Sequence, residues 1–437
     1  MIRLAIMLLT LLAALPARAE IDVQEITTPG GLNVWLVEDH TIPFVALELR
    51  FRGGAALDAP GKRGATNLMT ALLEEGTGDM GARDFARATE ELAASFRYAT
   101  YDDVLAVSAK FLTENRDQAV ALLRESLINP AFTQSAIDRV RAQVLSIIQS
   151  SEKDPSDMVG KAFDSLVFGT HPYGSSKNGT VDSVTGLTRD DIIAAHGAAM
   201  ARDRLYISAV GDISAGDLAT LIDSLLGDLP ATGAPLPGPA DLNLPGGIRI
   251  IDFDTPQSVA SFAQQGIDRD DPDFFAAYLL NQILGGGGFE SRLMNEVREK
   301  RGLTYGVYSY LLDKDGAQLW VGSVASANDR IGQAIEVIKT EWSRIRENGV
   351  TAEELQDAKT YMTGAYPLRF DGNGPIANIA VMMQMEDLPP EYITDRNNQV
   401  NAVTLEQINR VARELLTPEK LTFVVVGQPK DLNATLN

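Results

Sequence analysis

A segment rich in proline and glycine divides the chain near its middle. Residues 229–247 read LPATGAPLPGPADLNLPGG, and the five prolines in this stretch are unsuited to a helix or a central strand. At 437 residues the chain also exceeds the size at which one hydrophobic core gives way to two. We therefore predict an interdomain linker at 229–247, between an N-terminal domain at 20–228 and a C-terminal domain at 248–437.

The two predicted domains repeat one order of elements. Each contains a strand, a helix, a second helix that begins after a threonine, and a closing strand that ends in glycine. The strands are Val104–Phe111 and Leu205–Gly211 in the first domain, and Gln318–Val324 and Leu421–Gly427 in the second. Thr133 and Thr351 are the expected N-caps. The repeat predicts an α+β fold of two homologous α/β-sandwich halves, each a mainly antiparallel sheet covered by helices on one face.

The first residues have the pattern of a secretory signal peptide. Arg3 precedes an apolar run from Leu4 to Leu15, and residues 17–19 read Ala-Arg-Ala, the form of a cleavage site. The run is shorter than the roughly 20 residues of a membrane span. We expect loss of the signal peptide 1–19 and an exported, periplasmic mature protein with no stable membrane span.

Composition excludes several kinds of chemistry. The chain has no cysteine, so disulfides, thiolate zinc ligands and a cysteine nucleophile are all excluded. Its net charge is −21, and loss of the two arginines in residues 1–19 makes it −23 (−21 − 2), which argues against nucleic-acid binding. An acidic surface favours basic peptides, although the simpler interpretation is that the charge maintains solubility.

Long segments of both halves resemble the insulinase or pitrilysin family of zinc peptidases, the inverzincins. In the first half the resemblance rests on GKRGATNLMTALLEEGT (61–77), HPYG (171–174), LTRDDI and AVGDI. In the second half it rests on residues 266–310, GIDRDDPDFFAAYLLNQILGGGGFESRLMNEVREKRGLTYGVYSY. The chain is most similar to the half-length subunits of the family, and among them to the non-catalytic type, such as the alpha subunit of mitochondrial processing peptidase.

The resemblance also locates a degenerate zinc motif. Active members carry H-x-x-E-H on a helix, where histidines at i and i+4 share one zinc ion and the glutamate activates its water. By the resemblance these positions are Asn67, Thr70 and Ala71, and the third ligand, a downstream glutamate, falls at or near Ile147. None of these side chains suits a zinc ligand or a general base. We expect no catalytic residue, metal or cofactor in this chain.

Other titratable residues offer no evident replacement. The three histidines His40, His171 and His196 lack the spacing of a metal site, and we interpret them as structural. Glu74 and Glu75 adjoin the degenerate motif. They are either displaced catalytic carboxylates or, more simply, solvated residues at a helix end.

Two residues of the second half match a substrate-contact pair. Arg298 and Tyr305 correspond to an arginine and a tyrosine that, in the family, reach the substrate bound at the zinc site of the other half or subunit. A guanidinium can grip a peptide carbonyl, and a phenol can stabilise the oxyanion that forms when water attacks it. The alternative is a solvated charge and a strand residue in a half-buried sheet.

Two further features are candidates for peptide binding. The run Gly285, Gly286, Gly287 and Gly288 resembles the glycine-rich loop of the family, which implies close approach of a substrate backbone. It matches neither a Walker A loop nor a dinucleotide fingerprint. The strand near Val104 is a candidate sheet edge for an extended peptide, although Ala94–Asp103 departs from the family pattern.

Three functions remain open at this point. The first is a non-catalytic subunit that forms a heterodimer with a homologous chain carrying H-x-x-E-H and zinc, and that supplies Arg298 and Tyr305 for unfolded peptide substrates. The second is a structural or peptide-holding family member with no proteolytic partner. The third is an autonomous hydrolase with relocated chemistry, for which no G-x-S-x-G motif is present.

Overall fold

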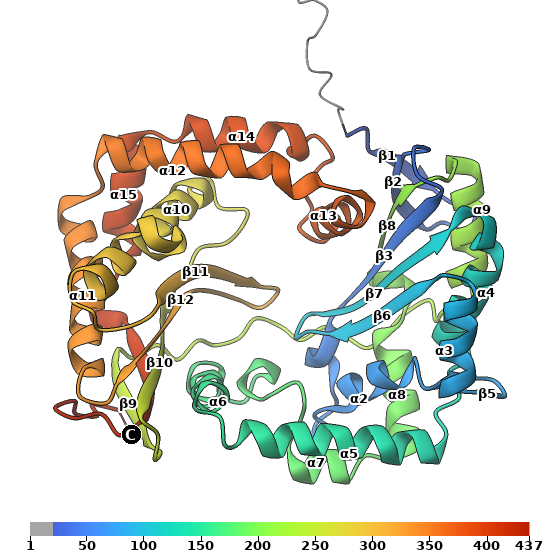
Figure 1. Ribbon diagram of the computed structural model, residues 1–437, viewed down its shortest axis with the longest axis horizontal. Coiled ribbons are helices and arrows are strands. Elements are labelled where there is room, and N and C mark those ends of the chain that lie inside the picture. Colours follow the sequence, from blue (N-terminus) through green and yellow to red (C-terminus); the bar gives the residue numbers. More distant parts are fainter. Residues whose placement is uncertain (1–20, 437) are drawn as a thin grey trace, which may run out of the picture.

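Two sheets, each with its own helices, make up the protein. The computed structural model describes residues 21–436, and Figure 1 shows the two halves facing each other. The predicted signal peptide at 1–19 lies outside the described residues. Among the described residues, no helix combines the length and the apolarity that crossing a membrane requires.

The first half is built on a six-stranded sheet in the order β1-β2-β8-β3-β7-β6. Its strands are β1 (Gln24–Thr27), β2 (Asn33–Glu38), β3 (Phe44–Arg52), β6 (Ser95–Thr100), β7 (Val104–Leu112) and β8 (Leu205–Gly211), and β4 (Gly76–Thr77) and β5 (Met80–Gly81) form a separate pair. Its helices are α2 (Ala65–Leu72), α3 (Ala82–Glu91), α4 (Arg116–Ile128), α5 (Gln134–Ser151), α6 (Pro155–Phe168), α7 (Val181–Thr185), α8 (Arg189–Ala199) and α9 (Ala215–Leu226). Pairing within the sheet is antiparallel except between β2 and β8.

The second half is built on a five-stranded sheet in the order β11-β12-β10-β13-β9. Its strands are β9 (Gly247–Asp252), β10 (Gln257–Gln265), β11 (Val307–Lys314), β12 (Ala317–Ala327) and β13 (Thr422–Gly427). Its helices are α10 (Phe274–Asn281), α11 (Ile331–Asn348), α12 (Ala352–Ala365), α13 (Asn373–Met385), α14 (Tyr392–Ala402) and α15 (Leu405–Leu415). The pair β13–β9 is parallel and the remaining pairs are antiparallel.

The strand orders confirm the predicted fold of two similar halves. Reading β6-β7-β3-β8-β2 against β11-β12-β10-β13-β9 gives the same succession of antiparallel pairs closed by one parallel pair. The predicted caps are also confirmed. Thr133 accepts a hydrogen bond from the backbone of Ala136 at the start of α5, and Thr351 forms a capping box with Glu354 at the start of α12.

The halves exchange one helix each, which the sequence did not predict. Helix α6 packs on β10 and β13 of the second sheet, and α13 packs on β3 and β8 of the first (Figure 1). Both helices hold the same place in the repeat, directly after the threonine-capped helix. The prediction that helices cover one face of each sheet is therefore incomplete, because the other face of each sheet is covered by a helix from the other half.

Different side chains form the two exchanged contacts. Helix α6 contributes Val159, Phe163 and Val167 to an apolar cluster with residues of the second sheet such as Val424. Helix α13 presents alanine to the first sheet, and the small side chain of Ala377 lets the helix backbone accept a hydrogen bond from Ser208 at 2.5 Å. Large apolar side chains therefore form the contact of α6, whereas α13 contacts its sheet through close approach of the helix backbone.

The segment between α9 and β9 contains no helix or strand, and it contacts both halves. Ala234 donates a backbone hydrogen bond to Ala198 in the first half, and Ala240 donates one to Gly316 in the second, at 3.0 and 2.8 Å. Strand β9 begins at Gly247, the last residue of the predicted linker. The domain boundaries themselves stay a prediction.

Candidate functional site

Helix α2 carries the positions of the degenerate zinc motif. Its first turn is fixed by Asp58, whose buried carboxylate accepts hydrogen bonds from the backbone N–H groups of Gly64 and Thr66, both at 2.8 Å. Gly64 takes a left-handed conformation with φ of 97° before the helix begins. A carboxylate in this position satisfies helix N–H groups that would otherwise lack acceptors.

The three motif positions of α2 make structural contacts. The amide of Asn67 donates to Asn178 Oδ1 at 3.1 Å. Thr70 is 2% exposed, donates to the carbonyl of Thr66 at 2.8 Å and accepts from the hydroxyl of Thr100 at 2.6 Å. Ala71 is partly buried and offers only a methyl group. These groups do not suit zinc, since two of the three already form protein hydrogen bonds and the third has no donor atom.

The residues around the motif do not supply replacement ligands. Ile147 lies on α5 with 53% of its surface exposed. Glu75 forms an ion pair with Arg139 of α5, and Glu74 is exposed beyond the end of α2. Although Glu74 is exposed overall, its carboxyl is partly desolvated, and this desolvation, followed by the neighbouring charge of Glu75, raises its pKa. Among the described residues, no group of three or more histidine, cysteine, aspartate or glutamate side chains is arranged to hold a metal ion.

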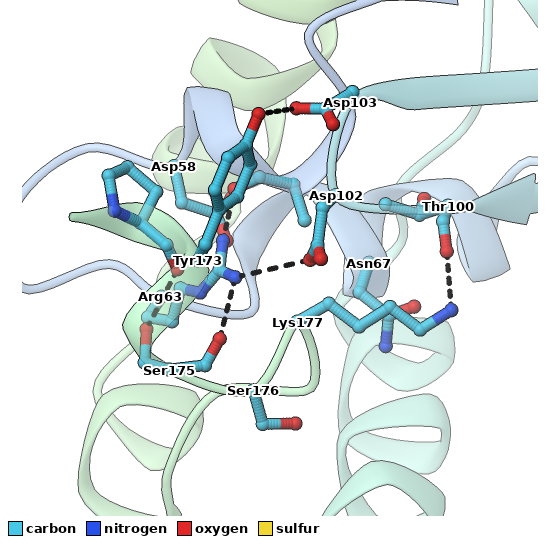
Figure 2. Close-up of polar contacts among 12 residues, drawn as sticks. Asp58, Arg63, Asn67, Thr100, Asp102, Asp103, Tyr173, Ser175, Ser176 and Lys177 are labelled. Atoms are coloured by element: carbon cyan, nitrogen blue, oxygen red, sulfur yellow. Dashed lines mark hydrogen bonds and ion pairs between the residues drawn. The ribbon is translucent and has the colours of Figure 1, made fainter. Parts of the chain in front are cut away.

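A network of charged side chains lies next to α2, and Figure 2 shows it. Arg63 donates to the carbonyl of Ser175 at 2.8 Å and lies 3.5 Å from Asp58 and 3.7 Å from Asp102. Lys177 donates to the backbone carbonyl of Thr100, the residue whose hydroxyl contacts α2 (Figure 2). Burial lowers the pKa of Lys177. The network is internally paired, so it acts as support for α2 rather than as an acid–base pair.

The three histidines lie apart and make separate contacts. His40 lies 2.7 Å from Asp212 and 3.3 Å from Glu38 at the surface, and hydrogen bonds to Asp212 and then Glu38 raise its pKa. His171 accepts from the backbone N–H of Tyr173 at 3.2 Å. His196 lies 2.8 Å from the carbonyl of Leu127, and burial lowers its pKa.

Arg298 contacts the segment that follows the glycine run. It lies at the end of the π-helical turn Met294–Glu299, with 32% of its side chain exposed. Its guanidinium lies 4.5 Å from the ring centre of Phe289, which is itself 61% exposed. Tyr305 precedes β11 and is 85% exposed, so the alternative of a half-buried strand residue is wrong. Tyr305 therefore faces solvent, and Arg298 is partly exposed.

The glycine run has a packing reason in its first half. Gly285 and Gly286 end the π-helical turn Gln282–Gly286, which packs on β11. A Cβ on Gly285 would lie 2.4 Å from Ser309 Oγ, so no side chain fits there. Gly287 joins this turn to the 3₁₀ turn Gly288–Glu290, and Gly288 has φ of 56° with open space around it. A Cβ on Gly287 would lie 2.7 Å from the carbonyl oxygen of Gln282, so of the four glycines Gly288 alone faces room for another molecule.

The edges of the first sheet are β1 and β6, not the strand at Val104. Strand β7 lies between β3 and β6 and is paired on both sides. The predicted edge at Val104 is therefore wrong, and the edge next to β7 is Ser95–Thr100, within the segment that departs from the family pattern.

A cavity of 750 Å³ lies where the two halves meet, and the sequence did not reveal it. Its lining includes eight carboxylates and five basic side chains. Lys314 at the tip of the β11–β12 hairpin pairs with Asp102, and the hydroxyl of Tyr173 bonds Asp103 and accepts from the backbone of Gly316. Neither Arg298 nor Tyr305 lines this cavity. Its residues come from segments that the chain brings together only through folding.

Comparison with known proteins agrees with these features. A family model described as Insulinase (Peptidase family M16) matches residues 33–181, and one described as Peptidase M16 inactive domain matches residues 186–362. A protein called non-peptidase homolog YmxG from Helicobacter pylori is 27% identical over 90% of this chain and 91% of its own length. An uncharacterized zinc protease from Streptomyces coelicolor is 26% identical over 94% and 91%. The crystal structure of a peptidase M16 inactive domain from Pseudomonas fluorescens is 31% identical, has a TM-score of 0.88, and the match covers 95% of this chain and 100% of that one.

Proposed function

This chain belongs to the insulinase family, peptidase family M16, and from that membership we propose that it is the non-catalytic, substrate-binding subunit of a heterodimeric zinc metallopeptidase. The partner is a homologous chain that carries H-x-x-E-H and the zinc ion. The substrates are unfolded peptides. We further propose that the mature subunit acts in the periplasm after removal of residues 1–19.

One contrast between the two halves carries the proposal. On α2, Asn67 and Ala71 lie one turn apart where two zinc ligands would stand, and neither suits the metal. In the second half, Arg298 and Tyr305 remain exposed at 32% and 85%. Loss of the metal groups together with retention of the contact pair is what division of labour between two chains predicts.

The chemistry of the pair suits a role at a partner's site. Among residues 21–436, one acidic side chain lies within ion-pair distance of Arg298, namely Glu299 at 3.5 Å, and the guanidinium stacks on the ring of Phe289. Its planar fork therefore keeps donors free for a peptide carbonyl. Tyr305 has a free phenol in solvent, which can donate to an oxyanion once a partner covers it. The relatives named as an inactive domain and a non-peptidase homolog support the non-catalytic role.

The test is cleavage of a quenched fluorescent unfolded peptide in the presence of zinc. The mature chain is assayed alone, then mixed with a homologous chain that carries H-x-x-E-H. We expect activity only in the mixture. Tyr305→Phe should lower kcat by about 100-fold, the effect of removing one oxyanion donor. Arg298→Ala should lower kcat and raise KM.

Matched controls are Tyr361→Phe and Arg87→Ala, since both residues are exposed, at 64% and 69%, on other surfaces. They should leave the mixture active. Zinc-dependent activity of this chain alone would refute the proposal. A stable complex that cleaves nothing would favour the structural or peptide-holding role instead.

A further inference from the structure

A second, smaller cavity of 310 Å³ lies at the base of helix α13. Its walls come from α10, α13, α14 and the 3₁₀ turn Tyr366–Phe370, which joins α12 to α13. Most of its lining is aromatic or aliphatic, including Phe274, Phe275, Tyr278 and Met383. Three arginines also line it: Arg269, Arg369 and Arg396. We call this site the arginine–aromatic pocket.

None of the three guanidinium groups has a carboxylate partner. Of the described residues, no aspartate or glutamate oxygen lies within 4.0 Å of Arg269, Arg369 or Arg396, whereas most ion pairs elsewhere involve arginine. The one acidic residue in the lining is Glu386, and burial raises its pKa. Three basic side chains against one acidic side chain give the lining of this pocket an excess of positive charge.

Aromatic rings fix two of these arginines in position. Arg269 lies 4.2 Å from the ring centre of Phe274 and 5.2 Å from that of Tyr392. Arg396 lies 4.6 Å from the ring centre of Tyr366 and 5.7 Å from that of Tyr278. Stacking covers the flat faces of a guanidinium and leaves the N–H groups at its edge available.

Few of those N–H groups bond to the protein. Arg269 donates to the hydroxyl of Tyr392 at 2.5 Å, and Arg396, 4% exposed, donates to the carbonyl of Met362 at 2.9 Å and to Asn397 at 3.1 Å. Arg369 is exposed at the rim and donates to no acceptor among the described residues. Each guanidinium has five donors, so most of the donors around this pocket lack a charged acceptor.

All three charges act on the hydroxyl of Tyr366, which also lines the pocket. Burial raises the pKa of Tyr366 to about 12, although Arg396, Arg369 and Arg269 each act to lower it, so all three lie within electrostatic reach of its hydroxyl. A buried, stacked and unpaired arginine is costly unless an anion reaches it.

We propose that the arginine–aromatic pocket binds a carboxylate attached to an aromatic or branched apolar group. The guanidinium edges match the two oxygens of a carboxylate, and the rings and methionines accept the apolar body. A C-terminal peptide residue and a free organic acid share this chemistry. The site uses neither Arg298 nor Tyr305, so it stands apart from the proposed peptidase role.

Such a ligand would connect the exchanged helix to its own half. The lining residues all belong to the second half, and helix α13 packs on the first sheet with its other side. A molecule held between α13, α10 and α14 would fix the exchanged helix in place, and its binding should raise the thermal stability of the whole chain.

The test is isothermal calorimetry on the mature chain with three probes: N-acetylphenylalanine, its uncharged amide, and 3-phenylpropionate. We expect the acid to bind at least about tenfold more tightly than the amide, the effect of one charge-assisted interaction. Arg369→Gln and Arg269→Gln should each weaken binding of the acid by about tenfold or more. Arg87→Gln is the matched control, because Arg87 is an exposed arginine on α3 with a side chain 69% exposed, and it should change nothing.

The other outcomes are equally informative. Preference for N-acetylphenylalanine over 3-phenylpropionate assigns the pocket to peptide C-termini, and equal binding assigns it to free acids. Equal affinity for acid and amide, or binding of the acid that neither arginine variant weakens, would overturn the proposal. No binding of either acid at millimolar concentration would overturn it as well. Because Arg369 is exposed, its variant is expected to fold, which circular dichroism checks.

Discussion

Phe163→Ala tests whether the exchanged helix α6 holds the two halves together. Phe163 is 7% exposed and lies in the apolar cluster shared by α6 and the second sheet. A buried aromatic ring removes roughly 150–250 Å² from water, worth about 4–6 kcal/mol at ~25 cal/mol per Å². Alanine keeps part of that burial, so we expect a loss of about 3–5 kcal/mol, the usual range for this change.

The three tryptophans make unfolding visible in both halves. Trp320 and Trp342 are fully buried in the second core, and Trp35 of β2 packs against Ala380 of α13. Urea unfolding followed by tryptophan fluorescence should show the loss, and hydrogen exchange should show weaker protection of β10 and β13.

Phe289→Ala is the matched control for this experiment. Phe289 is 61% exposed, so its loss should change the free energy of unfolding by no more than about 0.5 kcal/mol. A loss below about 1 kcal/mol for Phe163→Ala, with unchanged protection of β10 and β13, would show that α6 does not contribute the packing energy that we assign to it.

Three further predictions concern charge and backbone packing. Burial raises the pKa of Glu354, but hydrogen bonds from its arginine partner and the capping box outweigh this and bring it to about 2. The charged form of Glu354 therefore stabilises the fold fully above its unfolded pKa of 4.5, and this stabilisation is lost as the pH falls toward 2. Glu354→Gln should reduce the change in the free energy of unfolding with pH by about 1–2 kcal/mol, after allowance for solvent screening. Urea unfolding between pH 5 and 3 measures this change. Burial raises the pKa of Asp164 to about 6, so its charge opposes folding at pH 7, and Asp164→Asn should stabilise the protein there by about 1–2 kcal/mol, with no gain below pH 4. Gly285→Ala should cost about 1–3 kcal/mol because its Cβ would meet Ser309, whereas Gly160→Ala, with open space around it, should be neutral or stabilising in a thermal melt.

Local features of the fold were predictable from the sequence. The caps at Thr133 and Thr351 depend on side chains that act on their own helix, so a short sequence window contains the whole signal. The closing strand at Leu205–Gly211 was predicted with the bounds that β8 has, since a continuous run of β-branched and apolar residues is typical of a buried strand. The repeat then gave the similarity of the halves.

Features that depend on contacts between the halves were not predictable. The apolar faces of α6 and α13 indicate burial, but nothing in the residues says that each packs on the sheet of the other half. The edge strand was misassigned for a related reason, because strand order depends on the pairing of β7 with β3, a strand distant in the sequence, and the residues around Val104 do not record that pairing. The arginine–aromatic pocket joins Arg269 to Arg396 across more than a hundred residues, so no motif spacing records it.

The exchange of helices bears on how the chain can divide work with a partner. Separating the halves would expose the apolar cluster around α6 and would break the contact of α13 with Ser208. Two reciprocal helix contacts, and not the linker alone, therefore hold the two halves together. One folded unit thus contains both helix α2, with the degenerate zinc motif, and the pair Arg298 and Tyr305. Because neither member of the pair lines the cavity between the halves, the chain does not bring them to that cavity by itself. Under the proposed function, the exposed phenol of Tyr305 stabilises an oxyanion only after another protein surface excludes water from it.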